Sequence, residues 1–227
     1  MVDNSIIHLS LKLARKDLVI EFRRVHEFMS ILAFALTSIL ISSFAWRGML
    51  ILSPEVVSAT LWIIIYFSSI LTLTTSFSRE VDRGTIEGLR SLPCPSYAIL
   101  IGKMFYSAVI LFTVLIATIL SSTFFLNIPL SIVPSLMFVF VLGVIDLAIV
   151  GSIVSAIIMY SEGKTLLLSF LFFPVSVPIL IPGTQAAGKI IAGLGFLEIV
   201  SELKLLLAFL LAIVAVSILL FKHVFIE

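Results

Sequence analysis

The sequence predicts an all-α integral membrane protein with six transmembrane helices, N-in/C-in. Composition indicates the class, because 61% of the 227 residues are hydrophobic and soluble domains contain roughly 45–50%. Segment length indicates the architecture, because a helix needs about 20 apolar residues to cross a bilayer. Six segments reach or approach this length, at about 28–46, 56–77, 104–126, 133–159, 165–182 and 203–221. Little chain is left for a water-soluble domain, so residues 1–227 are expected to form one membrane domain.

The distribution of Lys and Arg gives the orientation, because cytoplasmic loops retain an excess of positive residues. With the N-terminus inside, eleven fall on the cytoplasmic side: Lys12, Arg15, Lys16, Arg23, Arg24, Arg79, Arg83, Arg90, Lys103, Lys164 and Lys222. Three fall outside: Arg47, Lys189 and Lys204. We therefore expect a multi-pass protein of the cytoplasmic membrane with both termini inside. The net charge of only +1 gives no reason to expect a nucleic-acid partner.

Residues 1–27 predict an amphipathic helix ahead of the first span. Apolar residues recur there at spacings of three and four, and basic residues flank them. The apolar stripe comprises Ile7, Leu11, Ala14, Leu18, Phe22 and Val25. Such a helix suits the inner headgroup plane of the membrane. Two interpretations remain open, a basic anchor that orients the first span and a docking surface for a partner.

A charged interruption, residues 78–103, separates the second and third spans. Gly84 is expected to end one turn, Thr85 to cap the next, and Glu87 to lie in the first turn of a short helix, where the helix dipole favours an acid. Pro93 would stop that helix. The pattern therefore predicts a rigid cytoplasmic helix from Thr85 to about Leu92. The alternative is a solvated loop.

Asp146 stands near the middle of the fourth span. An ionised carboxylate there costs about 2.5–3.5 kcal/mol on insertion scales, so Asp146 should face protein or water. Either it belongs to a substrate path or to coupling, or it is a neutral or hydrogen-bonded residue that fixes helix contacts. Small residues on another side of the same helix indicate close packing: Ala148, Ser152, Ser155 and Ala156.

Pro174 and Pro178 are expected to bend the fifth span, since each removes a backbone donor. The carbonyls that lose their partners need neighbouring groups, so we expect the bend to lie against the bundle interior. The bend is either a hinge or a static kink. The sequence does not place residues 183–202.

The sequence offers little chemistry of its own. Gly163-Lys164-Thr165 resembles the end of a phosphate-binding loop, but Ile158 stands where its first glycine is required. Cys94 is the single cysteine, and His8, His26 and His223 all fall near the cytoplasmic face, so we assign no metal site, haem ligand or catalytic residue. The missing ATPase motifs mean that any ATP-derived energy must come from a separate protein. An intramembrane enzyme is the least favoured class.

Two stretches carry a family resemblance. The set Glu80, Gly84-Thr85, Ile86-Glu87, Leu89, Leu92-Pro93, Pro95 and Lys103 resembles the coupling segment of ABC-2-type exporter permeases. Within that superfamily, the paired prolines make the chain most similar to the CcmB-like permeases of the haem exporter of cytochrome c maturation. Residues 173–181 resemble that family's Leu-Pro-Leu-x-Ile-Pro-Leu-Leu-Ile run. Pro182 and Asp146 depart from the family pattern.

The resemblance implies the permease component of an ABC transporter, with ATP hydrolysed by a cytosolic partner. Hydrolysis would be coupled to haem delivery or to release of a haem-loaded chaperone, so haem is a possible cargo. The coupling helix would enter a groove of the ATPase, with Ile86 and Leu89 as apolar contacts. Glu80, Arg83 and Glu87 would set the register. The implied membrane partners are a haem-handling membrane protein of the same complex and a second copy or related permease. The alternatives are an exporter for a drug, lipid or glycan, and a non-transporting assembly scaffold.

Overall fold

The computed structural model describes residues 2–23, 25–46, 53–74, 78–82, 84, 85, 88 and 95–224. Within these residues every regular element is a helix. Six helices are long and apolar enough to cross a membrane. They are α2 (Val25–Trp46), α3 (Pro54–Thr74), α6 (Ser96–Phe125), α7 (Val133–Ile157), α8 (Lys164–Ile191) and α9 (Val200–Val224). The predicted class and the number of candidate spans are therefore confirmed.

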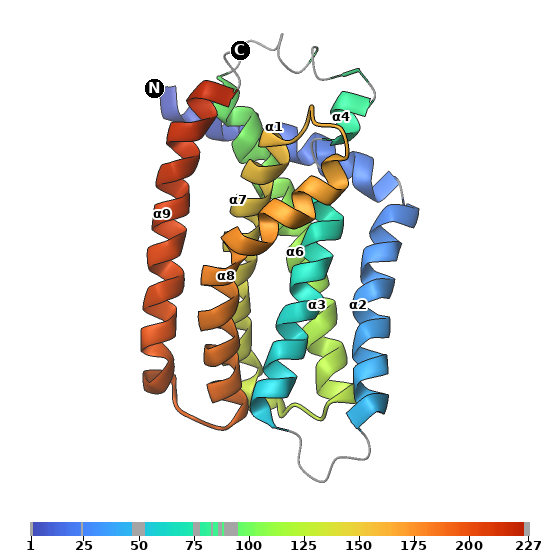
Figure 1. The fold of residues 1–227 in the computed structure, drawn as a ribbon, viewed down its shortest axis with the longest axis vertical. Coiled ribbons are helices and arrows are strands. Elements are labelled where there is room, and N and C mark those ends of the chain that lie inside the picture. Colours follow the sequence, from blue (N-terminus) through green and yellow to red (C-terminus); the bar gives the residue numbers. More distant parts are fainter. Residues whose placement is uncertain are drawn as a thin grey trace.

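The helices that flank the spans gather at one end of the bundle. Figure 1 shows both termini, α1 (Val2–Arg23) and α4 (Ser78–Asp82) at this end, with α1 crossing it at a steep angle to the spans. We call it the α1 end. Only Arg24 separates α1 from α2 in the chain, so the last turn of α1 lies where the first span begins.

Two helices extend well beyond their predicted limits. α6 begins at Ser96, so the end of the predicted 78–103 segment is already part of a span. α8 does not end at Pro182 but runs to Ile191. After a turn at Gly193, with φ +83, the short 3₁₀ helix η2 (Phe196–Ile199) leads into α9. Residues 183–202 are thus mostly helical and join the last two spans.

The core is centred on α7, which packs against α3, α6, α8 and α9. Trp62 of α3 stacks on Phe140 of α7 with ring centroids 4.7 Å apart. A Cβ at Gly143 or at Gly183 would meet a Trp62 ring atom at 2.7 Å, closer than real Cβ atoms come. Glycine at both positions therefore lets one indole ring pack closely against α7 and α8.

The bend of α8 is visible in Figure 1, where its first half runs obliquely and its second half runs along the bundle. Pro174, Pro178 and Pro182 all lie inside this helix. Pro174 and Pro178 are exposed on the outside of the bundle, and only Pro182 is buried. Our expectation that the bend lies against the interior is therefore wrong for the first two prolines. An open apolar hollow of about 630 Å³ lies beside Pro174.

Candidate functional site

The candidate site is built around α4, which forms the start of the charged interruption. The α4 helix ends in a left-handed turn, with Gly84 at φ +65. The amide of Gly84 donates to the Val81 carbonyl (3.0 Å) and that of Thr85 to the Glu80 carbonyl (2.9 Å). This pair of bonds is the Schellman motif that closes helix C-termini. The predicted turn at Gly84 is therefore confirmed.

Thr85 serves the helix that precedes it. Its hydroxyl donates to the Glu80 carbonyl at 3.2 Å, alongside its own amide. Glu87, in the first turn that Thr85 was expected to cap, lies outside the described part of the chain. What the structure does show is that Thr85 holds the main chain at Glu80, which fixes the start of that side chain.

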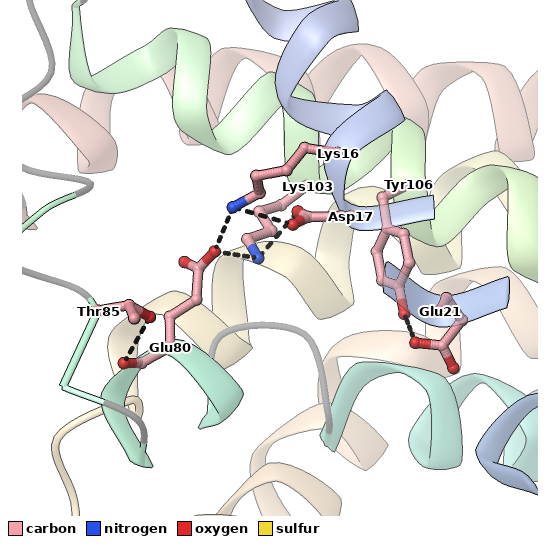
Figure 2. A network of polar contacts seen from close by, with 7 residues as sticks. All are labelled: Lys16, Asp17, Glu21, Glu80, Thr85, Lys103 and Tyr106. Carbon is pink, nitrogen blue, oxygen red and sulfur yellow. Dashed lines mark hydrogen bonds and ion pairs between the residues drawn. The ribbon is translucent and has the colours of Figure 1, made fainter. Parts of the chain in front are cut away.

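The Glu80 carboxylate lies between two lysines (Figure 2). Its Oε1 is 2.9 Å from Lys16 Nζ and 3.2 Å from Lys103 Nζ. Asp17 faces the same two cations, with its Oδ1 3.2 Å from Lys16 Nζ and its Oδ2 3.0 Å from Lys103 Nζ. Two acids and two lysines from α1, α4 and α6 thus form one closed ion network.

The network is largely shielded from solvent. Lys103 is 4% exposed, and Asp17 and Glu80 are 8% exposed. Breaking a buried ion pair from one side costs about 3–5 kcal/mol, because the remaining charge stays buried. The four charges therefore hold α4 firmly against α1 and α6.

Lys16 is the half-exposed member of the network, with 44% of its side chain accessible. Burial lowers the pKa of its ammonium, but the neighbouring carboxylates of Asp17 and Glu80 outweigh this effect and raise the pKa above its usual 10.5. Lys16 therefore stays charged at neutral pH and keeps its contact with Glu80.

The network depends on a polar face of α1 that points into the protein. Four α1 residues are buried at helical spacing: Ser10, Ala14, Asp17 and Glu21. A Cβ at Gly102 would lie 3.0 Å from both Leu13 Cβ and the Ser10 carbonyl oxygen, so this glycine lets α1 pack closely on α6. Further along, the Tyr106 hydroxyl donates to Glu21 at 2.8 Å. α1 is thus joined to α6 by polar contacts.

A second contact connects α4 to α8. Lys164, the first residue of α8, forms an ion pair with Asp82 at the end of α4. The Asp82 side chain is 61% exposed and that of Lys164 is 21% exposed, so this pair is weaker than the buried network. The short α4 helix therefore contacts α1, α6 and the start of the bent helix α8.

The structure brings together only part of the predicted coupling set. Glu80, Gly84 and Thr85 lie in the site. The remaining predicted residues lie outside the described residues: Arg83, Ile86, Glu87, Leu89 and Pro93. Their predicted contacts with an ATPase stay predictions.

Asp146, Pro174 and Pro178 take no part in the ion network. Asp146 is 1% exposed, so the expectation that it avoids lipid is confirmed. Neither carboxylate oxygen has a hydrogen-bond partner within the part of the chain that the structure describes. Of the small residues nearby, Ser155 donates to the Leu73 carbonyl at 3.2 Å, which joins α7 to α3.

Sequence reasoning missed the partners of this network. It identified Glu80 and Lys103 but assigned no role to Asp17, and it described Lys16 as a basic residue beside the apolar stripe. A signal was present, because Asp17 and Glu21 are one turn apart on one side of α1.

Among the described residues no group of His, Cys, Asp and Glu could hold a metal ion, and His8 and His26 are both exposed.

Comparison with known proteins gives one family. The family model described as CcmB protein matches residues 8–225, nearly the whole chain. No curated protein matches the chain significantly. The matched region includes α4, the ion network and all six candidate spans.

Proposed function

Because the chain belongs to the CcmB family, the membrane components of haem-export ABC transporters of cytochrome c maturation, we propose that its α4 segment couples a separate cytosolic ATPase to the membrane helices. The chain would supply no catalytic residue of its own. ATP would be hydrolysed in the partner, and haem would be the cargo or would be released on a loaded chaperone.

The observation that carries this proposal is the attachment of Glu80. Its side chain joins α4 to Lys16 of α1 and Lys103 of α6, within 3.2 Å of each. A loop that only connected two spans would gain little from a buried four-charge network, because desolvating charges is costly. A segment that receives force from a partner needs such an attachment. Movement of α4 would then reach α1 and α6 through Glu80, and α8 through Asp82.

The proposal requires the α1 end to face the cytoplasm. The excess of eleven positive residues over three supports this orientation. Cys94, the single cysteine, tests it. A membrane-impermeant maleimide should label Cys94 only in opened cells. In a Cys94→Ser background, Leu197→Cys should react in intact cells, because Leu197 is 86% exposed near the opposite end. The reverse pattern would refute the orientation.

The remaining partners follow from the family. We propose that two copies of this chain, or this chain and a related permease, pair with two ATPases and with a haem-handling membrane protein. Six spans are commonly half of such an exporter.

The function is tested by deleting the gene and measuring covalent haem attachment to c-type cytochromes. Normal attachment in the deletion strain would exclude the haem function. When the deletion strain is complemented with Glu80→Gln, haem attachment should be reduced although the variant protein reaches the membrane at its normal level. Glu162→Gln is the matched control, because Glu162 is an exposed acid between α7 and α8 that makes no ion pair with a described residue.

Coupling is tested separately by co-purification with the ATPase. Glu87→Lys and Leu89→Asp should weaken capture of the ATPase while membrane insertion persists. Glu80→Gln should reduce stimulation of ATP hydrolysis more than it reduces capture, because Glu80 is buried inside the permease. Unchanged capture in both of these variants would place the docking surface elsewhere.

A further inference from the structure

The exposed sides of α1 differ sharply from its buried side. At about 100° per residue, the buried acids Asp17 and Glu21 lie on the side that packs against α6. Two other sets of residues face away from the protein and remain exposed. One is apolar and the other is basic.

The apolar set comprises Ile7, Leu11 and Phe22, which are 55%, 49% and 51% exposed. On a helical wheel they lie within an arc of about 60°. This arc adjoins the buried side of α1, which carries Ser10, Ala14, Asp17 and Glu21. These side chains belong to the predicted stripe. Each is about half exposed, and the Phe22 ring packs edge-on against Phe28 of α2 with ring centroids 5.3 Å apart.

The basic set comprises Lys12, Arg15 and Arg23, which are all exposed. They lie within an arc of about 80°, on the side opposite to Asp17 and Glu21. None of the three makes an ion pair with a described residue. Because the two acids are turned into the protein, the exposed surface that these residues form is cationic.

We propose that this basic and apolar surface of α1 binds anionic phospholipid. Phosphates of neighbouring headgroups would pair with the Arg15 and Arg23 guanidinium groups and the Lys12 ammonium, which are spread along about three turns of α1. The acyl chains would contact Ile7, Leu11 and Phe22. Arginine suits such a site because its planar donors bind phosphate oxygens in pairs.

Lipid fits this surface better than a protein groove does. Only Arg24 separates α1 from the first span, so the surface lies at the level where hydrocarbon gives way to headgroups. An amphipathic helix in that layer places its apolar residues toward the acyl chains and its cations among the headgroups. The two adjoining arcs have this order. The inference does not depend on the coupling role of α4.

The test is native mass spectrometry of the purified chain with equal amounts of phosphatidylglycerol and phosphatidylcholine. The wild type should retain phosphatidylglycerol preferentially, and added salt should reduce the preference. Lys12→Gln/Arg15→Gln/Arg23→Gln should lose most of it, with an upper limit on the order of fivefold for each cation at low salt.

Two matched variants distinguish an effect of the cations of α1 on lipid preference from an effect of misfolding. Lys204→Gln removes an exposed cation near the opposite end of the bundle and should leave the preference unchanged. Lys12→Arg keeps the charge and should also keep the preference. Equal retention of the two lipids by the wild type would overturn the proposal, as would an unchanged preference in the triple variant. If the triple variant instead loses ATPase capture with no change in lipid retention, the surface is a protein contact and the proposal fails.

Discussion

Lys103 is the residue whose removal should reveal most about the ion network at α4. It is 4% exposed and lies 3.0 Å from Asp17 and 3.2 Å from Glu80. Replacement by Met keeps the length of the side chain and removes its charge. Among the described residues, Asp17 and Glu80 would then share Lys16 alone, whose side chain is 44% exposed.

The size of the effect follows from two opposing terms. At an effective dielectric constant of about 20, each Lys103 contact contributes about 5 kcal/mol of attraction. Desolvation of the ions offsets much of this. Breaking such a network from one side therefore costs about 3–5 kcal/mol. For a chain of this size the melting temperature should fall by about 2–4 °C for each kcal/mol, or about 6–20 °C in total.

A charge-balanced variant distinguishes electrostatics from packing. Asp17→Asn/Lys103→Met removes one acid and one cation, so the network is again neutral. It should recover at least half of the lost melting temperature. Thermal unfolding in detergent, followed by size-exclusion chromatography, gives the melting temperatures of the wild type, the single variant and the double variant. Lys204→Met is the control for loss of an exposed cation. The network does not hold α4 if Lys103→Met and Lys204→Met have the same melting temperature. The same conclusion follows if the double variant has a lower melting temperature than Lys103→Met.

Three further predictions concern backbone and packing. Gly143→Ala should lower stability by about 1–3 kcal/mol through overlap with the Trp62 ring, whereas Gly195→Ala, with no neighbour within 4 Å, should melt like the wild type. Gly84→Ala should lower the free energy of unfolding by about 1–2 kcal/mol, because residue 84 has a positive φ. Gly84→Asn should lower it less, because Asn tolerates this conformation. Equal losses in the two variants would contradict a backbone cause. Pro178→Ala should change stability by less than about 1 kcal/mol, since the ring is exposed and leaves no cavity, yet it should reduce haem attachment if the bend is a hinge.

The fold could be predicted because it depends on properties that are local in sequence. Six apolar runs predict six spans wherever the helices pack. The turn at Gly84 was also predictable, because a left-handed residue after a helix favours glycine over nearly all others. The burial of Asp146 followed from the cost of placing a carboxylate in lipid. None of these inferences needed to know which helices touch.

The ion network could not be predicted because it joins residues far apart in the chain. Asp17 and Lys103 are separated by more than a third of the sequence, and their pairing requires α1 to lie across α6. The apolar stripe of α1 suggested that its polar residues face water. In the structure Asp17 and Glu21 face α6, since Lys103 and Tyr106 there provide partners for them. A carboxylate enters a protein interior when such partners are present.

The packing of α8 shows how force applied at α4 could be used. Before Ser176 only Leu168 and Phe172 of this helix are buried, whereas the part after it buries residues on most turns and holds Gly183 against Trp62. The Asp82 contact is made at Lys164, on the loosely packed half. Pro174 lies before the tightly packed half and Pro178 at its start, and each removes a backbone hydrogen bond that would resist bending. At the far end, Lys189 binds Glu202 at 2.7 Å and joins α8 to α9. A displacement of α4 should therefore swing the first half of α8 about the prolines while its second half stays fixed in the core.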